Sequence, residues 1–315
     1  MEEGYAPEGD VYIASSSTEE VAGSGAPKTV EWLKEHNVRL QFLMDEGGMI
    51  VDEPMAGVKG RYAMIGTMEK GTGNIKVIAR STGGHASAPE KNTPIARLSA
   101  FINDIETKNP NKLEFTSTVL EMFKRLGPQA KGVLGFAMRH AKLLSPILKK
   151  VLPAVSAKGA AMLRTTMAWT MYSGSSARNV IPESAWVNIN TRFIIHQGID
   201  ETKKILQPYL DKYNLEAEYI NCHEPQTPVD HNGKAFKTVE ETVKEIYPGV
   251  IPSPYVMTGG TDAYYYAPVT DNAIRFAPLY IDSQQLGSIH AKDENIFVSS
   301  LPKGIEFYKA IIKKM

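Results

Sequence analysis

The first part of the chain alternates between apolar runs and polar turns. The segment that begins at Val11 reads as a short buried strand, and a turn with two adjacent carboxylates follows it. Helical spacing over residues 27–36 leads to a second apolar run, residues 38–44, which ends on Asp45. A strand, a helix and a strand in this order predict a parallel pair with a right-handed crossover. Both acidic turns would then lie beyond the carboxyl ends of neighbouring strands, where open α/β sheets bind ligands.

The acidic turns carry Glu19, Glu20 and Asp45. Carboxylates crowded at one edge of a sheet repel one another unless a cation or shared protons neutralise them. Neighbouring carboxylates can divide the chemistry, because one ligates a metal while the other takes a proton from water. Adjacent glutamates are also common on solvated turns. Their position after an apolar strand, with Asp45 at the matching place, is what favours a functional site.

The rest of the chain alternates between strand and helix patterns. Strands are predicted over 60–67, 74–80, 162–172, 185–195, 216–221 and 273–281, with a short one that ends near Met257. Helices are predicted over 93–107, 200–213, 233–246 and 300–313. The simplest architecture is α/β, with a mostly parallel-sheet catalytic domain that is interrupted by an inserted α+β lid, or dimerisation, domain.

This architecture divides the chain into residues 1–73 and 226–315, which form the catalytic domain, and residues 74–225, which form the lid. Within the lid, residues 117–158 form a helical insertion with eight Lys or Arg and one acid, Glu121. A basic amphipathic stretch of this kind can lie on a membrane surface or line a lipid-binding cleft. The alternative is a solvated helical hairpin packed on the lid. We prefer the hairpin because prolines interrupt any long amphipathic face.

Composition narrows the class of protein. The 315 residues are 43% hydrophobic, which is enough to form the hydrophobic core of one large domain or two ordinary ones. The formal net charge is zero, so the chain has no excess of basic residues that would favour binding to nucleic acid. No apolar run reaches membrane-spanning length. The single cysteine, Cys222, excludes an internal disulfide and favours a reducing, cytoplasmic location. A site strand so soon after Met1 leads us to expect further residues upstream in the complete protein.

Two histidines and one arginine are further candidates. His290 follows a strand in the same domain as the acids, and beside a carboxylate cluster it is a candidate nitrogen ligand for zinc. His85 stands among small residues and is either an ordinary loop histidine or an accessible donor. Arg192 stands among apolar strand residues and needs a partner, which is either a substrate carboxylate or a salt bridge within the lid.

Taken together, these motifs resemble family twenty of clan MH, the co-catalytic zinc metallopeptidases that include carboxypeptidase S, aminoacylase and the N-acyl-amino-acid hydrolases. The resemblance covers nearly the whole chain, and the helical insertion resembles the carboxypeptidase S branch. Seven segments carry it, in order: residues 18–26, 45–48, 69–71, 84–89, 179–182, 259–262 and 290–294. Each segment is weak alone, and their order makes the resemblance specific.

The resemblance implies a role for each residue that matches a family motif. Glu19 would be the general base and acid for the attacking water. Glu20 and His290 would bind one zinc ion, and Asp45 would bind the other. His85 would reach across a homodimer, formed through the lid, to stabilise the oxyanion.

The remaining implied roles concern the substrate. Asn179 and Arg192 would hold the substrate or its carboxylate, and Gly259 and Thr261 would line its pocket. The implied reaction is zinc-dependent cleavage of an amide bond next to a free carboxylate, in a small peptide or an N-acyl amino acid.

The sequence departs from the family pattern in two places. No His-x-Asp motif occurs, and the aspartate that bridges both metals in the family is absent, so the ligand set is incomplete. Tyr264 stands where the family often has an arginine, two residues after the aspartate of Gly-Gly-Thr-Asp. The alternative to a hydrolase is a non-enzymatic function, in which the chain is an N-terminally truncated, catalytically silent homologue that acts only as a dimerising fold. Zinc content distinguishes the two.

Overall fold

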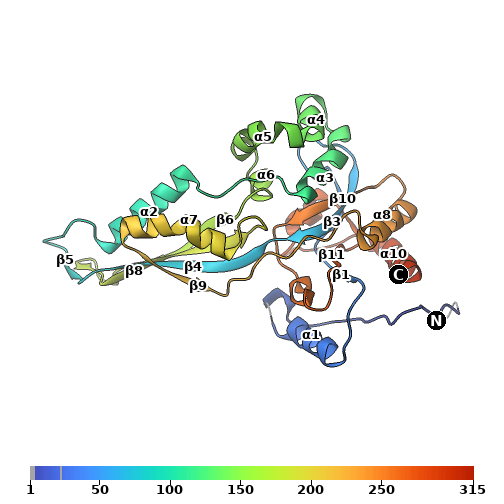
Figure 1. The fold of residues 1–315 in the computed structure, drawn as a ribbon, viewed down its shortest axis with the longest axis horizontal. Helices are drawn as coiled ribbons and strands as arrows, with labels where there is room; N and C mark the ends of the chain where they lie inside the picture. The colour runs from blue at the N-terminus through green and yellow to red at the C-terminus, as the bar shows by residue number, and fades with distance from the viewer. Residues whose placement is uncertain (1–3, 22) are drawn as a thin grey trace. The chain divides into compact units, whose positions relative to one another are not determined.

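The computed structural model describes residues 4–21 and 23–315, and it divides the chain into two compact units (Figure 1). Unit 1 consists of the residues up to Glu69 together with Phe115–Val151 and Gln226–Met315. Unit 2 consists of Lys70–Glu114 and Leu152–Pro225. Each unit has its own sheet and its own hydrophobic core.

The sheet of unit 1 is mixed. Its strands are β1 (Leu43–Asp45), β2 (Ile50–Asp52), β3 (Arg61–Glu69), β10 (Ile251–Met257), β11 (Ala273–Arg275) and β12 (Tyr280–Ile281). The pairs β1–β11, β10–β3 and β12–β2 are parallel, whereas β2–β3 and β11–β3 are antiparallel. The connection from β2 to β3 is too short for a parallel crossover, which explains that antiparallel pair. The α/β prediction is confirmed, and the main sheet is mixed, with three parallel pairs and two antiparallel pairs.

Two amphipathic helices, α8 (Lys234–Ile246) and α10 (Leu301–Lys314), pack their apolar sides against this sheet. Unit 1 also contains α1 (Gly25–Glu35) and the short α9 (Ser283–Ser288). Phe236 of α8 and Phe307 of α10 are fully buried in one core with Ile65 of β3. A second, smaller core joins α1 to the segment after residue 261 through Leu33 and Tyr266.

Two predicted strands are not formed as expected. The segment that begins at Val11 has no strand structure, and the side chain of Ile13 is 92% exposed. A strand needs a neighbour for its backbone groups, and none of the described strands pairs with this segment. The predicted strand 273–281 is two strands, β11 and β12, and Pro278 lies between them without the N–H that a ladder requires.

The helical insertion contains α3 (Ser117–Leu126), α4 (Gly132–Arg139), α5 (Ala141–Val155) and α6 (Ala157–Ala161). We assigned it to the lid, but the structure groups its residues up to Val151 with unit 1. The reason is that α3 buries Val119, Met122 and Leu126 and packs against β10 of that unit. The expected interruption by prolines is also wrong for α5, which continues through Pro146 and Pro153. Among the described helices, none has the length and apolar character needed to cross a bilayer.

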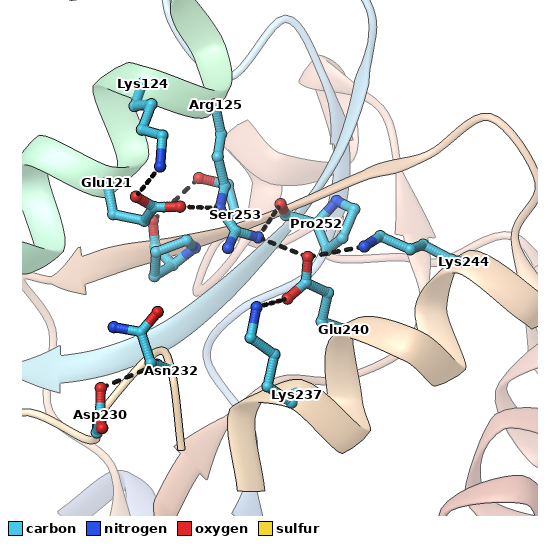
Figure 2. Close-up of polar contacts among 11 residues, drawn as sticks. Glu121, Lys124, Arg125, Asp230, Asn232, Lys237, Glu240, Lys244, Pro252 and Ser253 are labelled. Atoms are coloured by element: carbon cyan, nitrogen blue, oxygen red, sulfur yellow. Dashed lines mark hydrogen bonds and ion pairs between the residues drawn. The ribbon is translucent and has the colours of Figure 1, made fainter. Parts of the chain in front are cut away.

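An ion-pair network fastens α3 to unit 1 (Figure 2). The guanidinium of Arg125 lies 2.8 Å from Oε1 of Glu121 and 3.1 Å from Oε1 of Glu240, which belongs to α8. The Glu240 carboxylate also contacts Lys237 and Lys244, at 3.0 and 2.8 Å. Burial alone would raise the pKa of Glu240, but hydrogen bonds from the two lysines and the charge of Arg125 lower it to about 2. The carboxylate therefore stays ionised in the folded chain.

Unit 2 is an antiparallel α+β unit, as predicted for the lid. Its four-stranded sheet has the order β6 (Thr166–Ser173), β8 (Ser184–Phe193), β4 (Gly71–Arg80) and β9 (Glu216–Ile220). A separate two-stranded ribbon pairs β5 (Gly84–His85) with β7 (Val180–Ile181). Two helices, α2 (Pro94–Lys108) and α7 (Ile199–Tyr213), lie side by side over the four-stranded sheet (Figure 1) and bury Phe101 and Leu206 against it.

A second buried ion pair lies at the end of β3 in unit 1. Arg275 of β11 is 1% exposed, and its Nε lies 2.7 Å from Oε2 of Glu69. The backbone N–H and the hydroxyl of Thr261 both donate to the Glu69 carboxylate, at 3.1 Å each. Every oxygen of this buried carboxylate is thereby satisfied, and the loop after β10 is fastened to β3.

Gln226 extends this network to the same loop. Its side-chain carbonyl accepts a hydrogen bond from Arg275. Its side-chain amide donates to the backbone carbonyls of Ala263 and Tyr264, at 3.1 and 2.6 Å. Residues 261–264 of the loop are therefore held by Glu69 and by Gln226, and both of these side chains contact Arg275.

We expect Arg275→Met to lower the free energy of unfolding by about 3–5 kcal/mol, because it leaves the Glu69 carboxylate buried without its cation. The double variant Glu69→Gln/Arg275→Met should recover part of that loss, since no buried charge remains unpaired. Urea unfolding measures both. Arg39→Met, which breaks an exposed ion pair with Asp271, serves as the control and should cost less than about 1 kcal/mol. If the double variant loses as much free energy of unfolding as Arg275→Met alone, or more, the pairing of Arg275 with Glu69 is contradicted.

We expect Glu240→Gln to lower the free energy of unfolding by about 1–3 kcal/mol at neutral pH. Because folding lowers the pKa of Glu240 from 4.5, its stabilisation is present above about pH 4.5 and is lost as the pH falls toward 2. The difference between the wild type and Glu240→Gln should therefore shrink between pH 6 and pH 3 in urea titrations. Glu241→Gln, on the exposed side of α8, is the matched control. A difference that does not depend on pH would contradict this account.

Candidate active site

Glu19 and Glu20 lie on the short 3-10 helix η1 (Glu19–Val21) of unit 1. The turn around them closes where the backbone N–H of Gly23 donates to the carbonyl of Thr18, at 2.8 Å. A Cβ atom at Gly23 would lie only 2.3 Å from the Thr18 side chain, so this position accepts only glycine without a shift. The glycine after the paired glutamates therefore allows the tight turn that presents both carboxylates.

Asp45 is the last residue of β1, as expected of a site residue at the carboxyl end of a strand. Its side chain is held by two backbone N–H groups, those of Ala263 at 2.6 Å and Glu46 at 2.9 Å. The chain then passes so close to β3 that a Cβ atom on Gly48 would lie 2.0 Å from the carbonyl oxygen of Met64. The aspartate is thus oriented by the loop that the buried arginine fixes.

His290 follows α9 in unit 1 and faces the paired glutamates. Its Nδ1 lies 3.6 Å from Oε2 of Glu20, and both side chains are largely exposed. Its backbone has φ 62°, a left-handed conformation that is uncommon for a residue with a side chain. The backbone N–H donates to the Glu294 carboxylate at 3.1 Å, which helps to hold this turn. The structure therefore brings Glu20 and His290 together, as the sequence predicts.

The acids around Glu19 act on one another electrostatically. Burial raises the pKa of Glu19, and the charges of Glu20, Asp262 and Asp45 raise it further, while His290 lowers it. Burial, and then the charge of Asp45, also raise the pKa of Asp262. These shifts show that several carboxylates lie close enough to repel one another. A bound cation would relieve this repulsion.

Glu46 belongs to this cluster although the sequence analysis did not select it. Burial, a hydrogen bond to Asp45 and the charges of Asp45 and Glu19 raise its pKa to about 8. At neutral pH a protonated Glu46 can therefore donate to Asp45. The only sequence signal was its position between Asp45 and two glycines, which does not reveal that Glu19 lies nearby.

The donor chemistry of the cluster suits zinc, which binds carboxylate oxygen and imidazole nitrogen. Glu20 and His290 offer two such donors, and Asp45, whose charge also acts on Glu19, offers one more. The described residues contain no group of three His, Cys, Asp or Glu side chains arranged to hold a metal ion. A catalytic zinc usually takes three protein ligands. Residues 4–21 and 23–315 therefore do not form a complete zinc site by themselves.

His85 lies on the two-stranded ribbon of unit 2, and Asn179 directly precedes its second strand, β7. The exposed ring of His85 accepts a hydrogen bond at Nδ1 from the backbone N–H of Ser87, at 3.2 Å. A neutral ring that accepts at Nδ1 carries its proton on Nε2. The backbone carbonyl of Asn179 accepts from the N–H of Ala86, at 2.9 Å, which ties both candidates to one ribbon.

Arg192 lies in β8, half-buried in the sheet of unit 2 and opposite Thr72 of β4. Burial, and then the charges of Arg192 and Arg164, lower the pKa of Lys70 to about 7, so Arg192 adds to a region rich in positive charge. A salt bridge within the lid would require a carboxylate beside Arg192. In the part of the chain that the structure describes, Arg192 forms no salt bridge with a carboxylate.

Gly259 and Thr261 lie in the loop after β10. A Cβ atom at Gly259 would meet nothing within 4 Å, so this position faces open space. Thr261 is buried, and its hydroxyl is committed to Glu69. Tyr264 packs edge to face against Tyr265, with ring centroids 5.4 Å apart. Contact of this loop with a substrate stays a prediction.

Comparison with known proteins identifies the family. The sequence profile of Peptidase family M20/M25/M40 matches residues 1–314. The chain is 28% identical to the N-fatty-acyl-amino acid synthase/hydrolase PM20D1 of Xenopus tropicalis over 316 residues, which cover 99% of this chain and 61% of the relative. It is 27% identical to the probable carboxypeptidase S-like 2 of Dictyostelium discoideum over 320 residues, which cover 99% of this chain and 60% of the relative. The chain thus spans about three fifths of the length of these relatives.

The fold agrees with this assignment. The crystal structure of the M20 family metallo-carboxypeptidase Sso-CP2 from Sulfolobus solfataricus superimposes with a TM-score of 0.64 at 17% identity. The alignment covers 95% of this chain and 69% of that chain, so the fold is shared. On the profile match over almost every residue and the shared fold, this chain belongs to the M20/M25/M40 family of peptidases.

Proposed function

We propose that the protein carrying this chain hydrolyses an amide bond next to a free carboxylate, in an N-acyl amino acid or a small peptide. The observation that carries the proposal is the cluster of acids around Glu19, which faces the imidazole of His290. The names of the relatives support this substrate class. One is an N-fatty-acyl-amino acid synthase/hydrolase and another a probable carboxypeptidase, and both names imply an amide beside a carboxylate.

Glu20 and His290 would hold one zinc ion and Asp45 would contribute to a second, with further ligands from outside the described residues. When bound, zinc supplies Lewis-acid polarisation of the scissile carbonyl and makes water more acidic. Glu19 would take the proton from the attacking water and pass it to the leaving amine. The raised pKa of Glu19 suits both halves of that task, because the carboxyl group must gain and then lose a proton.

Residues of unit 2 would orient the substrate. Arg192, which has no carboxylate partner among the described residues, is suited to bind the substrate carboxylate. Asn179 lies beside His85, beyond the opposite end of the β4–β8 ladder from Arg192, so it would hold the substrate from the ribbon together with His85. His85 would donate from Nε2 to the developing oxyanion, since its Nδ1 already accepts from Ser87. We propose that His85 acts across a homodimer formed through unit 2.

A second candidate function is a catalytically silent chain that serves only as a dimerising fold. The specific observation in its favour is that no group of three metal-binding side chains occurs among residues 4–21 and 23–315. Metal content separates the two proposals, because the silent form needs no zinc.

We expect Glu19→Gln to lower kcat by about 100- to 10,000-fold, since it removes the group that moves the proton. The measurement is zinc-dependent hydrolysis of an N-acyl amino acid and of a dipeptide by the complete protein. Glu31→Gln, at an exposed glutamate of α1, is the matched control and should keep the wild-type rate. An undiminished rate in Glu19→Gln would end the proposed role of Glu19.

We expect Glu20→Gln and His290→Gln each to weaken zinc binding by at least about tenfold, because each removes a direct ligand. Competition with a chromophoric chelator measures the affinity without any assay of activity. Asp293→Asn changes an exposed carboxylate near His290 and should bind zinc like the wild type. Equal affinities in all four proteins would favour the silent chain.

A further inference from the structure

Helix α5 of the insertion exposes an apolar stripe. Of its fifteen residues, only Ala141 is buried. Leu143, Ile147 and Val151 are 80%, 61% and 47% exposed. Because they recur every four residues, their side chains line one side of the helix. An amphipathic helix normally turns such a stripe toward the core, so this one faces outward with nothing described covering it.

The preceding helix, α4, adds to this apolar surface. Val133 and Phe136 are 85% and 53% exposed, although α4 also buries Gly135 and Met138. Single exposed apolar residues are ordinary on protein surfaces, whereas a run of them over two consecutive helices marks an interaction site. We call Val133, Phe136, Leu143, Ile147 and Val151 the apolar stripe.

The charges around the apolar stripe all have one sign. No Asp or Glu occurs between Glu121 and Glu183, and the basic residues within α4, α5 and the residues that flank them are Lys131, Arg139, Lys142, Lys149, Lys150 and Lys158. At about 100° per residue, Lys150 and Lys142 lie on the flank of the stripe next to Leu143. In the described part of the chain, no carboxylate pairs with Lys142, Lys149 or Lys150. Their charges are therefore open to an external anion.

We propose that α4 and α5 dock on an anionic lipid surface, with the apolar stripe in the acyl boundary and the lysines at the headgroups. An amphipathic helix with basic residues beside its apolar side is suited to that boundary. A second copy of this chain would bring lysines against lysines, which charge repulsion disfavours. Nucleic acid would match the lysines but would leave the apolar residues in water. Only a surface that is both apolar and anionic complements both features.

The ion-pair network of Figure 2 holds α3, the first helix of the insertion, against unit 1. Arg125 ties the carboxyl-terminal half of α3 to Glu240 and to the carbonyl of Pro252. The insertion is thus anchored through α3, and the exposed residues of the apolar stripe take no part in that anchorage. Substitutions in the apolar stripe should therefore leave the fold intact.

The test is flotation of the full chain with phosphatidylcholine vesicles that contain or lack phosphatidylserine. We expect binding to the anionic vesicles, weaker binding in high salt, and little binding to phosphatidylcholine alone. Ile147→Ser should weaken binding by about tenfold, and Lys142→Gln/Lys150→Gln by about tenfold or more. Circular dichroism and thermal unfolding confirm that each variant is folded.

Matched controls make the result specific. Ile305→Ser alters an isoleucine of α10 that is 61% exposed, the same fraction as Ile147. Lys28→Gln/Lys91→Gln removes two exposed lysines outside the insertion. Both controls should bind like the wild type. The proposal is overturned if the chain does not float with anionic vesicles, or if the control and stripe variants lose binding equally. Dimerisation that Ile147→Ser abolishes, without vesicle binding, would also overturn it and would identify a second copy as the occupant.

Discussion

Mutual repulsion among carboxylates is the constraint on which the candidate site depends. Glu19, Glu20, Asp45, Glu46 and Asp262 come from three separate segments of the chain, and the pKa values of Glu19, Glu46 and Asp262 are raised by burial and by their neighbours. A fold that gathers unpaired acids loses free energy unless something positive compensates. His290 supplies one positive or metal-binding group at the edge of the cluster. A divalent cation is the compensation that agrees with the M20/M25/M40 family of this chain.

The buried pair of Arg275 and Glu69 explains how the fold holds part of this cluster in place. Glu69 fixes Thr261, and Gln226 carries the network to Ala263, whose N–H in turn holds the carboxylate of Asp45. The pair lies at the end of β3, the strand to which β2, β10 and β11 are all paired. A buried ion pair contributes little net stability, but it fixes the geometry of the loop that depends on it.

The sequence predicts the elements whose periodicity is strong and local. The helices α2, α7 and α8 follow apolar spacings that are visible in the sequence, and alternating apolar and polar positions predict the strands β4, β8 and β9. Which of these strands pair is shown by the structure. The strand expected at Val11 fails because a strand depends on a neighbour, which no local pattern reports. The assignment of the insertion to the lid fails for a similar reason, since the contact of Arg125 with Glu240 spans 115 positions of sequence. Motif order selects Glu20, Asp45 and His290 as candidates, but not Glu46, whose raised pKa depends on its burial and on Asp45 and Glu19.

The central claim is that Glu20 and His290 close on one divalent ion beside Glu19. Anomalous diffraction at the zinc edge, from crystals grown with zinc, tests it most directly. The account predicts a peak within bonding distance of the Glu20 carboxylate and the His290 ring, about 2.0–2.2 Å from the ligand atoms. If crystals grown with an excess of zinc show no anomalous peak at this position, or show zinc only at other surfaces, the claim is contradicted.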